Sequence, residues 1–292
     1  MRISDHQQPI ERAAGTVMLI HGMWSRPQVW QGFREFLEAR GYRVLTPALR
    51  HHDREPGDAP HPELGQTSLA DYVADLAAEI ATLGHKPLAV GHSMGGTLAQ
   101  MLAARGLVEA AVALAPAQCA GTFNFDLRSI WIFRREFARY GFWQKPQLPA
   151  FDAMRFGVLN GLPGDEQERL YATLVPESGR AAFEIGWWFL DRQRTTWINP
   201  ADVACPMLFL TGDRDKLTPL WLARRTAAIY DGKARFEELG GHAHWLISEP
   251  GWEAVAERCA DYFEREAGAH ATAIRERHAP FRAGSVLASA GN

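Results

Sequence analysis

Short apolar runs alternate with amphipathic stretches along most of this 292-residue chain. Runs at residues 16–21, 42–47 and 87–91 have the length of buried strands, and each stops at or just before a glycine or proline. Residues 29–40, between the first two runs, carry apolar side chains at helical spacing and are followed by a glycine. Strands that alternate with helices predict an α/β fold, with a mostly parallel sheet covered by helices on both faces.

The alternation pauses after a fourth run at residues 110–115 and resumes with runs at 206–211 and 234–239, which gives about six strands. The intervening residues 117–200 show no clear strand pattern and hold 16 of the 31 aromatic residues. A segment of that length is too long for a plain loop. We therefore predict that residues 117–200 form a helical cap over the ends of the strands.

The other domain boundaries follow from this insertion. Residues 15–116 and 201–266 form the predicted core. Residues 267–292 are rich in small side chains and have weak periodicity, which is typical of a loosely packed tail. The aromatic-rich cap is also a candidate surface for a homodimer.

Composition excludes several classes of function. The formal net charge of −3 gives no field that favours nucleic acid or an anionic membrane. The polar N-terminal residues lack a secretory signal, and no window reaches the roughly 18 apolar residues of a membrane span. Three widely separated cysteines fit reduced thiols, so we expect a cytoplasmic protein.

The stretch Gly91-His92-Ser93-Met94-Gly95 joins a predicted strand to a predicted helix. This is the G-x-S-x-G pattern in the context that makes it a nucleophile elbow, a sharp turn that pushes the serine hydroxyl out of the sheet. The helix that follows directs its free N–H groups and positive dipole end toward the same place. The pattern predicts a nucleophilic Ser93, and the alternative is an ordinary turn.

With these segments in view, the chain resembles the α/β-hydrolases, and in particular their serine esterase and lipase-like branch. The resemblance rests on "LIHGMW" at residues 19–24, "GHSMGG" at 91–96, "LFLTGDRDKLTP" at 208–219 and "GGHAHWLISEP" at 240–250. Relatives often begin with an antiparallel hairpin, but only about 15 residues precede the first strand here. We therefore expect a minimal sheet ordered second-first-third-fourth-fifth-sixth, with Ser93 beside the point where the order reverses.

The resemblance implies a base and an acid to activate Ser93. A glutamate and a proline often follow the base in relatives, and that spacing favours His244; His242 is the alternative base. The spacing G-x-x-D favours Asp215 as the acid that orients the imidazole. Asp213 is the alternative acid, and it otherwise stabilises the turn.

The resemblance also implies an oxyanion hole formed by the backbone N–H groups of Met23 and Met94. Trp24 and His92 are candidate residues of the substrate pocket, although a histidine at the position of His92 more often braces the elbow. The sequence "RHHD" at residues 50–53, with His61, matches no established ligand spacing, so no metal is expected. No nucleotide-binding pattern occurs, so no cofactor is expected either.

These residues predict a serine hydrolase that cleaves a small to medium ester, lactone or thioester with an apolar acyl part through an acyl-enzyme on Ser93. Perhydrolase or haloperoxidase, C–C bond hydrolase and lyase chemistries use the same triad and remain alternatives. A serine at the elbow argues against the branches that use an aspartate nucleophile. An alternative of another class is a non-catalytic ligand-binding protein on a hydrolase scaffold, which would predict a broken triad.

Overall fold

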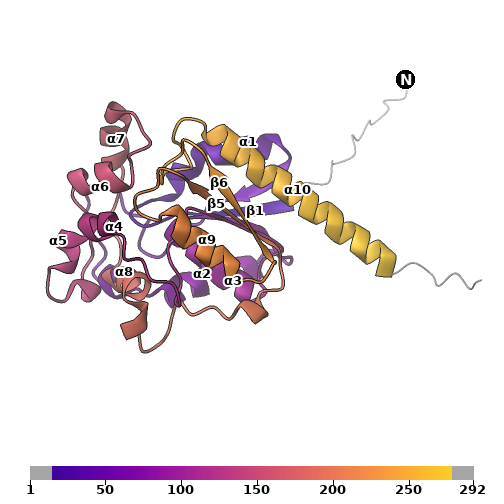
Figure 1. Ribbon diagram of the computed structural model, residues 1–292, viewed down its shortest axis with the longest axis horizontal. Helices are drawn as coiled ribbons and strands as arrows, with labels where there is room; N and C mark the ends of the chain where they lie inside the picture. Colours follow the sequence, from indigo (N-terminus) through magenta and orange to yellow (C-terminus); the bar gives the residue numbers. More distant parts are fainter. Residues whose placement is uncertain (1–14, 278–292) are drawn as a thin grey trace, which may run out of the picture.

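A six-stranded parallel sheet forms the centre of the computed structural model, which describes residues 15–277 and the side chains as far as Glu266 (Figure 1). Its strands are β1 (Gly15–Ile20), β2 (Tyr42–Leu45), β3 (Leu88–His92), β4 (Ala111–Leu114), β5 (Met207–Gly212) and β6 (Ala234–Leu239). The order is β2-β1-β3-β4-β5-β6, and every neighbouring pair is parallel. This confirms the expected order, including its reversal between β1 and β3.

Helices cover both faces of this sheet, as the alternating pattern predicts (Figure 1). On one face α1 (Gln31–Ala39) packs against α10 (Trp252–Arg277). On the other lie α2 (Leu69–Ala81), α3 (Met94–Ala104) and α9 (Leu220–Ala228). The Ser68 hydroxyl accepts the N–H of Ala70, and Asp71 accepts that of Ser68, so α2 begins with a capping box.

The connection from β3 to α3 is the most tightly packed part of the core. All of β3 and α3 except Ala104 is buried. A Cβ added at Gly91 would collide with the backbone carbonyl of Gly95, and one added at Gly95 would collide with the carbonyl of Ile20 in β1. Both positions therefore require glycine. A side chain at Gly91 would push β3 away from the start of α3, and one at Gly95 would push α3 away from β1.

Residues 117–200 fold as a series of short helices at the carboxyl ends of the strands, seen at the left of Figure 1. They are α4 (Leu127–Ile132), α5 (Arg134–Phe137), α6 (Phe151–Gly157), α7 (Gly164–Tyr171) and α8 (Gly179–Gly186), with 3-10 turns at Phe142–Gln144, Trp188–Leu190 and Pro200–Asp202. Residues 127–142 and 181–193 carry apolar side chains at helical spacing, and each stretch contains more than one short helix or 3-10 turn. One isolated antiparallel bridge joins Gln147 to Glu177.

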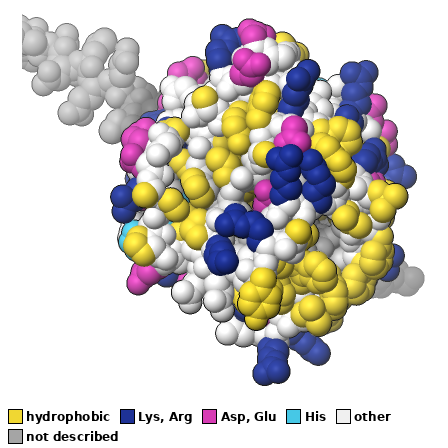
Figure 2. Space-filling view, turned by 90° about the vertical axis from the view of Figure 1, so that its left-hand side faces the viewer, with side chains coloured by type: hydrophobic (Ala, Val, Ile, Leu, Met, Phe, Trp, Pro, Cys, Tyr) yellow, Lys and Arg dark blue, Asp and Glu magenta, His cyan; other side chains and the backbone are white. Residues whose placement is uncertain are grey.

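The outer face of the cap exposes many large apolar side chains. Phe125 is 74% exposed and Leu127 is 79% exposed. Phe123 stacks on Phe125 and also contacts Trp188 and Phe189. In Figure 2, which views this side of the molecule, hydrophobic side chains gather in patches between lysines and arginines. The suggestion of a homodimer surface remains a prediction.

The last helix is longer than the sequence pattern indicates. We expect a helix over residues 252–263, and α10 continues to Arg277 (Figure 1). The added sequence is rich in alanine, glutamate and arginine, which have high helix propensity even where no apolar stripe repeats. The remainder of the predicted tail, residues 278–292, and any hairpin within residues 1–14 lie outside the described residues.

No helix within residues 15–277 is both long enough and apolar enough to cross a bilayer.

Substitution of Gly91 by alanine tests the close approach at the start of α3. The added methyl group meets backbone that cannot move without displacing the turn, so we expect a loss of about 3 kcal/mol or more in the free energy of unfolding. Gly164→Ala is the matched control: it adds a methyl group into open space at the start of α7 and should change stability by less than about 1 kcal/mol. Urea denaturation of both variants measures the difference. Equal stabilities would contradict the packing argument.

Candidate active site

Ser93 lies at the junction of β3 and α3 in a strained backbone conformation. Its φ of 53° and ψ of −118° place it outside the regions that non-glycine residues favour. The turn is fixed by its own hydrogen bonds, since the Ser93 N–H donates to the carbonyl of Leu114 at 2.9 Å and its carbonyl accepts the N–H of Gly96 at 2.9 Å. The surrounding sheet thus stabilises a strained turn that presents the serine beyond the end of the strand.

His244 and Asp215 form a hydrogen-bonded pair near the carboxyl ends of the strands. The His244 Nδ1 lies 2.8 Å from the Asp215 Oδ2. Asp215 also accepts the N–H groups of Leu217 and Thr218 at 2.8 Å and the Thr218 hydroxyl at 2.7 Å. Both oxygens of the Asp215 carboxylate therefore accept hydrogen bonds. Because a carboxylate can only accept, the Nδ1 of His244 carries the proton that it shares with Asp215. The Nε2 of the neutral ring is then a hydrogen-bond acceptor.

The alternative base and acid of the sequence analysis occupy different positions. The His242 Nδ1 lies 2.9 Å from a carboxylate oxygen of Glu249, which also accepts the N–H of Ala243 at 2.9 Å. Asp213 is exposed and accepts the N–H of Gly241 at 2.8 Å, so it holds a turn. His242 and Asp213 are therefore each engaged away from the pair formed by His244 and Asp215.

His92 lies behind the serine rather than in an open pocket. Its buried ring donates from Nε2 to the backbone carbonyl of His244 at 2.8 Å, and the ring edge meets Trp245. Burial, together with the proximity of His244, lowers the pKa of His92 to about 3. The neutral ring therefore ties the turn at Ser93 to the loop that carries His244.

The loop after β1, residues 21–25, lies against Ser93. A Cβ added at Gly22 would stand 3.0 Å from the Ser93 Cβ, so this loop approaches the serine as closely as side chains allow. The next residues, Met23 and Trp24, are buried, and Trp24 adopts a φ of 63°. Met94 is the first residue of α3, so its N–H has no intrahelical acceptor. Gly22 thus lets the loop that contains Met23 lie close to Ser93.

Residues 117–200 contact the loop after β1. Ser93 is only 6% exposed, and the Trp24 ring packs against Phe133 of the cap with ring centroids 5.8 Å apart. The N–H of Val175 in the cap donates to the Trp24 carbonyl at 2.8 Å. Trp24 is therefore a direct contact between the loop after β1 and the cap.

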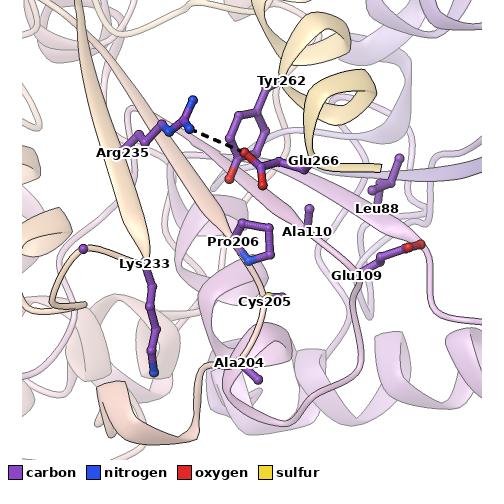
Figure 3. A pocket seen from close by; sticks show the side chains of 11 residues that line it. Leu88, Glu109, Ala110, Ala204, Cys205, Pro206, Lys233, Arg235, Tyr262 and Glu266 are labelled. Carbon is purple, nitrogen blue, oxygen red and sulfur yellow. Dashed lines mark ion pairs between the residues drawn. The ribbon is translucent and has the colours of Figure 1, made fainter. Parts of the chain in front are cut away.

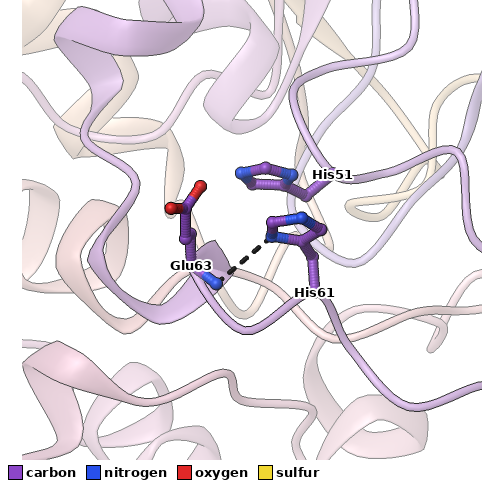
Figure 4. Close-up of side chains that lie close together, drawn as sticks. All are labelled: His51, His61 and Glu63. Atoms are coloured by element: carbon purple, nitrogen blue, oxygen red, sulfur yellow. Dashed lines mark hydrogen bonds between the residues drawn. The ribbon is translucent and has the colours of Figure 1, made fainter.

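The two histidines of the "RHHD" stretch, His51 and His52, have different partners in the structure. His51 stacks on His61 with ring centroids 3.8 Å apart and planes 8° from parallel, and ligand atoms of this pair and Glu63 lie within 4.8 Å of one another (Figure 4). The His61 Nδ1 already accepts the Glu63 N–H. Nitrogen lone pairs lie in the ring planes, so stacked parallel rings do not direct them at a common point.

A cavity of about 380 Å³ lies at the opposite, amino-terminal edge of the sheet (Figure 3). Its lining includes Lys233 and Arg235 but also Glu109 and Glu266, and Arg235 pairs with Glu266. Opposite charges balance there, and the strands separate this cavity from Ser93. It therefore does not belong to the candidate active site.

Two residues of the site were not found by sequence reasoning. Thr218 donates to Asp215, and Glu177 of the cap pairs with His52 of the "RHHD" stretch at 3.1 Å. The threonine lies within the quoted "TGDRDKLTP" segment, where its spacing after Asp215 is the only available signal. Nothing in the sequence near Glu177 connects it with His52, because the pair is 125 residues apart.

Comparisons with known proteins agree with this fold. A model described as the alpha/beta hydrolase family matches residues 17–258. The chain is 31% identical over 247 residues to a pimeloyl-(acyl-carrier protein) methyl ester esterase of Aromatoleum aromaticum. This alignment covers 79% of this chain and 92% of that enzyme. It is also 36% identical to a pyrethroid hydrolase of Sphingobium wenxiniae, over 87 residues that span only 30% of each protein.

Solved structures show the same fold. A pyrethroid hydrolase from Sphingobium faniae superposes with a TM-score of 0.65 and 19% identity, over 87% of this chain and 99% of that one. A methylesterase from Arabidopsis gives a TM-score of 0.63 and 15% identity, over 85% of this chain and 99% of that one. At such low identity these likenesses concern the fold alone.

The buried rings of His21 and His92 allow a test by titration. Burial lowers the pKa of each to about 3, aided by His52 for His21 and by His244 for His92. We expect their imidazole NMR signals not to titrate between pH 5 and 8, whereas the same rings in urea-unfolded protein should titrate near the ordinary value of about 6.5. Because the unfolded chain takes up these protons first, stability should fall as the pH drops from about 6.5 toward 3, by about 1.4 kcal/mol per histidine and pH unit. Midpoints near pH 6 in the folded protein would contradict this.

Proposed function

Because the chain belongs to the α/β-hydrolase family, we propose that it hydrolyses carboxylic esters by way of an acyl-enzyme on Ser93. The observations that carry the proposal are the hydrogen bond of 2.8 Å between Asp215 and the Nδ1 of His244, and the strained turn at Ser93. One of the relatives named above is a methyl ester esterase and another is a pyrethroid hydrolase, which favours hydrolysis over perhydrolysis, C–C cleavage or lyase chemistry. The three positions expected for the triad carry serine, aspartate and histidine, which also disfavours a non-catalytic binding protein.

In this mechanism, the Ser93 hydroxyl attacks the ester carbonyl carbon while the Nε2 of His244 accepts its proton. Asp215 accepts a hydrogen bond from the Nδ1–H of His244 and, as a carboxylate, stabilises the imidazolium that forms. The tetrahedral oxyanion receives hydrogen bonds from the N–H groups of Met23 and Met94, each worth about 2.7–4 kcal/mol. Collapse expels the alcohol, which takes the proton from His244. Water, activated by the same imidazole, then releases the acid from Ser93.

The substrate we propose is a small to medium ester with an apolar acyl part. Buried Met23 and Trp24 border the serine, and Phe133 of the cap continues this apolar wall. An apolar group gains free energy by leaving water for such a wall, whereas a charged group there would lose its solvation. Thioesters and lactones present the same carbonyl chemistry to Ser93 and belong to the same proposal.

Matched pairs of variants test which residues carry the reaction. Ser93→Ala and His244→Ala should each lower kcat/KM for nitrophenyl acetate by at least about 10³-fold, because each removes a member of the triad. His242→Ala should lower it by less than about 10-fold, because that ring is bound to Glu249. The same contrast is expected between Asp215→Asn and Asp213→Asn.

A fluorophosphonate probe tests the nucleophile directly, and it should label Ser93 in the folded protein. Activity that survives in Ser93→Ala would refute the proposal.

Acyl-chain length tests the enclosure of the site. Since Ser93 is only 6% exposed, we expect kcat/KM to be highest for acetate or butyrate nitrophenyl esters. A dodecanoate ester should react at least about 10-fold more slowly, because it must displace packed cap residues. Ser93→Ala supplies the background rate for every ester. Equal rates for short and long chains would show that the cap does not limit the pocket.

A further inference from the structure

Glu177 is a carboxylate of the cap that is 1% exposed and takes no part in the proposed chemistry. Its oxygens accept hydrogen bonds from the His52 Nε2 at 3.1 Å, the Tyr72 hydroxyl at 2.7 Å and the N–H of Ser178 at 2.6 Å. His52 follows β2 and Tyr72 lies on α2, so this one side chain joins the cap to two separate parts of the core. All three neighbours donate hydrogen bonds to Glu177, and a carboxylate suits this position because both of its oxygens accept them.

His52 meets Glu177 as a cation. Its Nδ1 lies 3.0 Å from the backbone carbonyl of Arg50 and its Nε2 faces the carboxylate, so both ring nitrogens face acceptors and both carry protons. Burial opposes the charge on each group, yet the carboxylate raises the pKa of His52 and the imidazolium lowers the pKa of Glu177. A buried ion pair of this kind gives little net stability over apolar packing but fixes the groups that carry it.

The segment that Glu177 holds also contacts the loop beside Ser93. The backbone of Glu177 exchanges two hydrogen bonds of 2.8 Å with Gln147, which keeps residues 175–178 extended. Two residues earlier, the N–H of Val175 donates to the carbonyl of Trp24 at 2.8 Å. Trp24 has a φ of 63° and directly follows Met23, so this bond stabilises a turn that its own backbone preference disfavours.

A second contact leads from the ion pair to the same loop. The ring of His21 lies 5.2 Å from that of His52, donates from Nδ1 to the carbonyl of Gly22 at 2.9 Å and accepts the N–H of Leu49 at 3.2 Å. His21 is neutral, since burial lowers its pKa to about 3. The residues on both sides of Met23 are therefore supported by the groups around Glu177.

From these contacts we infer that Glu177, paired with His52, is a positioning residue that holds residues 22–24 in the conformation in which the Met23 N–H faces Ser93. The inference rests on the proposed function, because the Met23 N–H matters only where an oxyanion develops beside Ser93. Glu177 touches no reacting atom in this account. Its effect reaches the reaction through the bond from Val175 to Trp24 and through the neutral ring of His21.

Glu177→Ala should lower kcat by between about 10- and 100-fold, less than the loss of an oxyanion donor, while KM for nitrophenyl acetate changes by less than about 2-fold. Glu177→Gln keeps the shape and one acceptor, so its kcat should lie between those of Glu177→Ala and the parent. Affinity for a trifluoromethyl ketone, which forms an oxyanion on Ser93, should fall in parallel with kcat.

The matched control is Glu184→Ala. Glu184 is an equally buried carboxylate of the cap, but it accepts from Ser68 and Leu69 at the start of α2 and does not contact residues 172–178 in its hydrogen bonds. This variant should melt at a lower temperature yet keep kcat within about 3-fold of the parent. Equal losses of kcat in Glu177→Ala and Glu184→Ala would overturn the positioning role. A kcat equal to that of the parent in folded Glu177→Ala and Glu177→Gln would overturn it too.

The Ser93→Ala variant separates these results from a failure of the proposed function. If Ser93→Ala is inactive, the proposed function stands whatever the Glu177 variants show. An active Ser93→Ala refutes the proposed function itself.

Discussion

The close approach of three backbone segments around Ser93 is the constraint on which the rest of the structure depends. Gly91 and Gly95 let the end of β3 and the start of α3 meet without side chains between them, and Gly95 also admits the carbonyl of Ile20 from β1. This contact stabilises a φ of 53° at Ser93, a conformation that costs about 1–3 kcal/mol elsewhere. Because the strained turn forms within the packed centre of the sheet, its geometry is set by the whole core.

Much of this could be read from the sequence because the signals are local. Apolar runs of four to six residues predict the strands, the resemblance to the α/β-hydrolases implies their order, and the glycines around Ser93 mark the turn. The segment "TGDRD" contains Asp215 three residues after a glycine, and the structure places its carboxylate against His244. Such residues follow directly from strand ends, so topology alone brings them to one edge of the sheet.

The cap could be predicted only as an insertion, because the interactions that shape it are long-range and polar. Its helices are short, and the apolar spacing of residues 127–142 does not show where α4 ends and α5 begins. His52 shows the same limit: next to His51 it suggests a surface cluster, yet the structure turns it inward to meet a carboxylate 125 residues away. No periodicity encodes such a pair, since each partner looks like an ordinary loop residue until the cap has folded.

Two buried carboxylates of the cap, Glu177 and Glu184, accept hydrogen bonds from the same part of the core, the first turns of α2. Glu184 accepts from Ser68 and from the N–H of Leu69, where the helix dipole favours a negative charge, while Glu177 accepts from Tyr72 less than one turn further on. Apolar contacts tolerate sliding, whereas a buried carboxylate loses its donors when it moves by an ångström. Two such attachments at one helix end restrict how the cap can rotate on the core. The loop that contains Met23 and Trp24 lies between this attachment and Ser93, so the orientation of the cap and the shape of the site are set together.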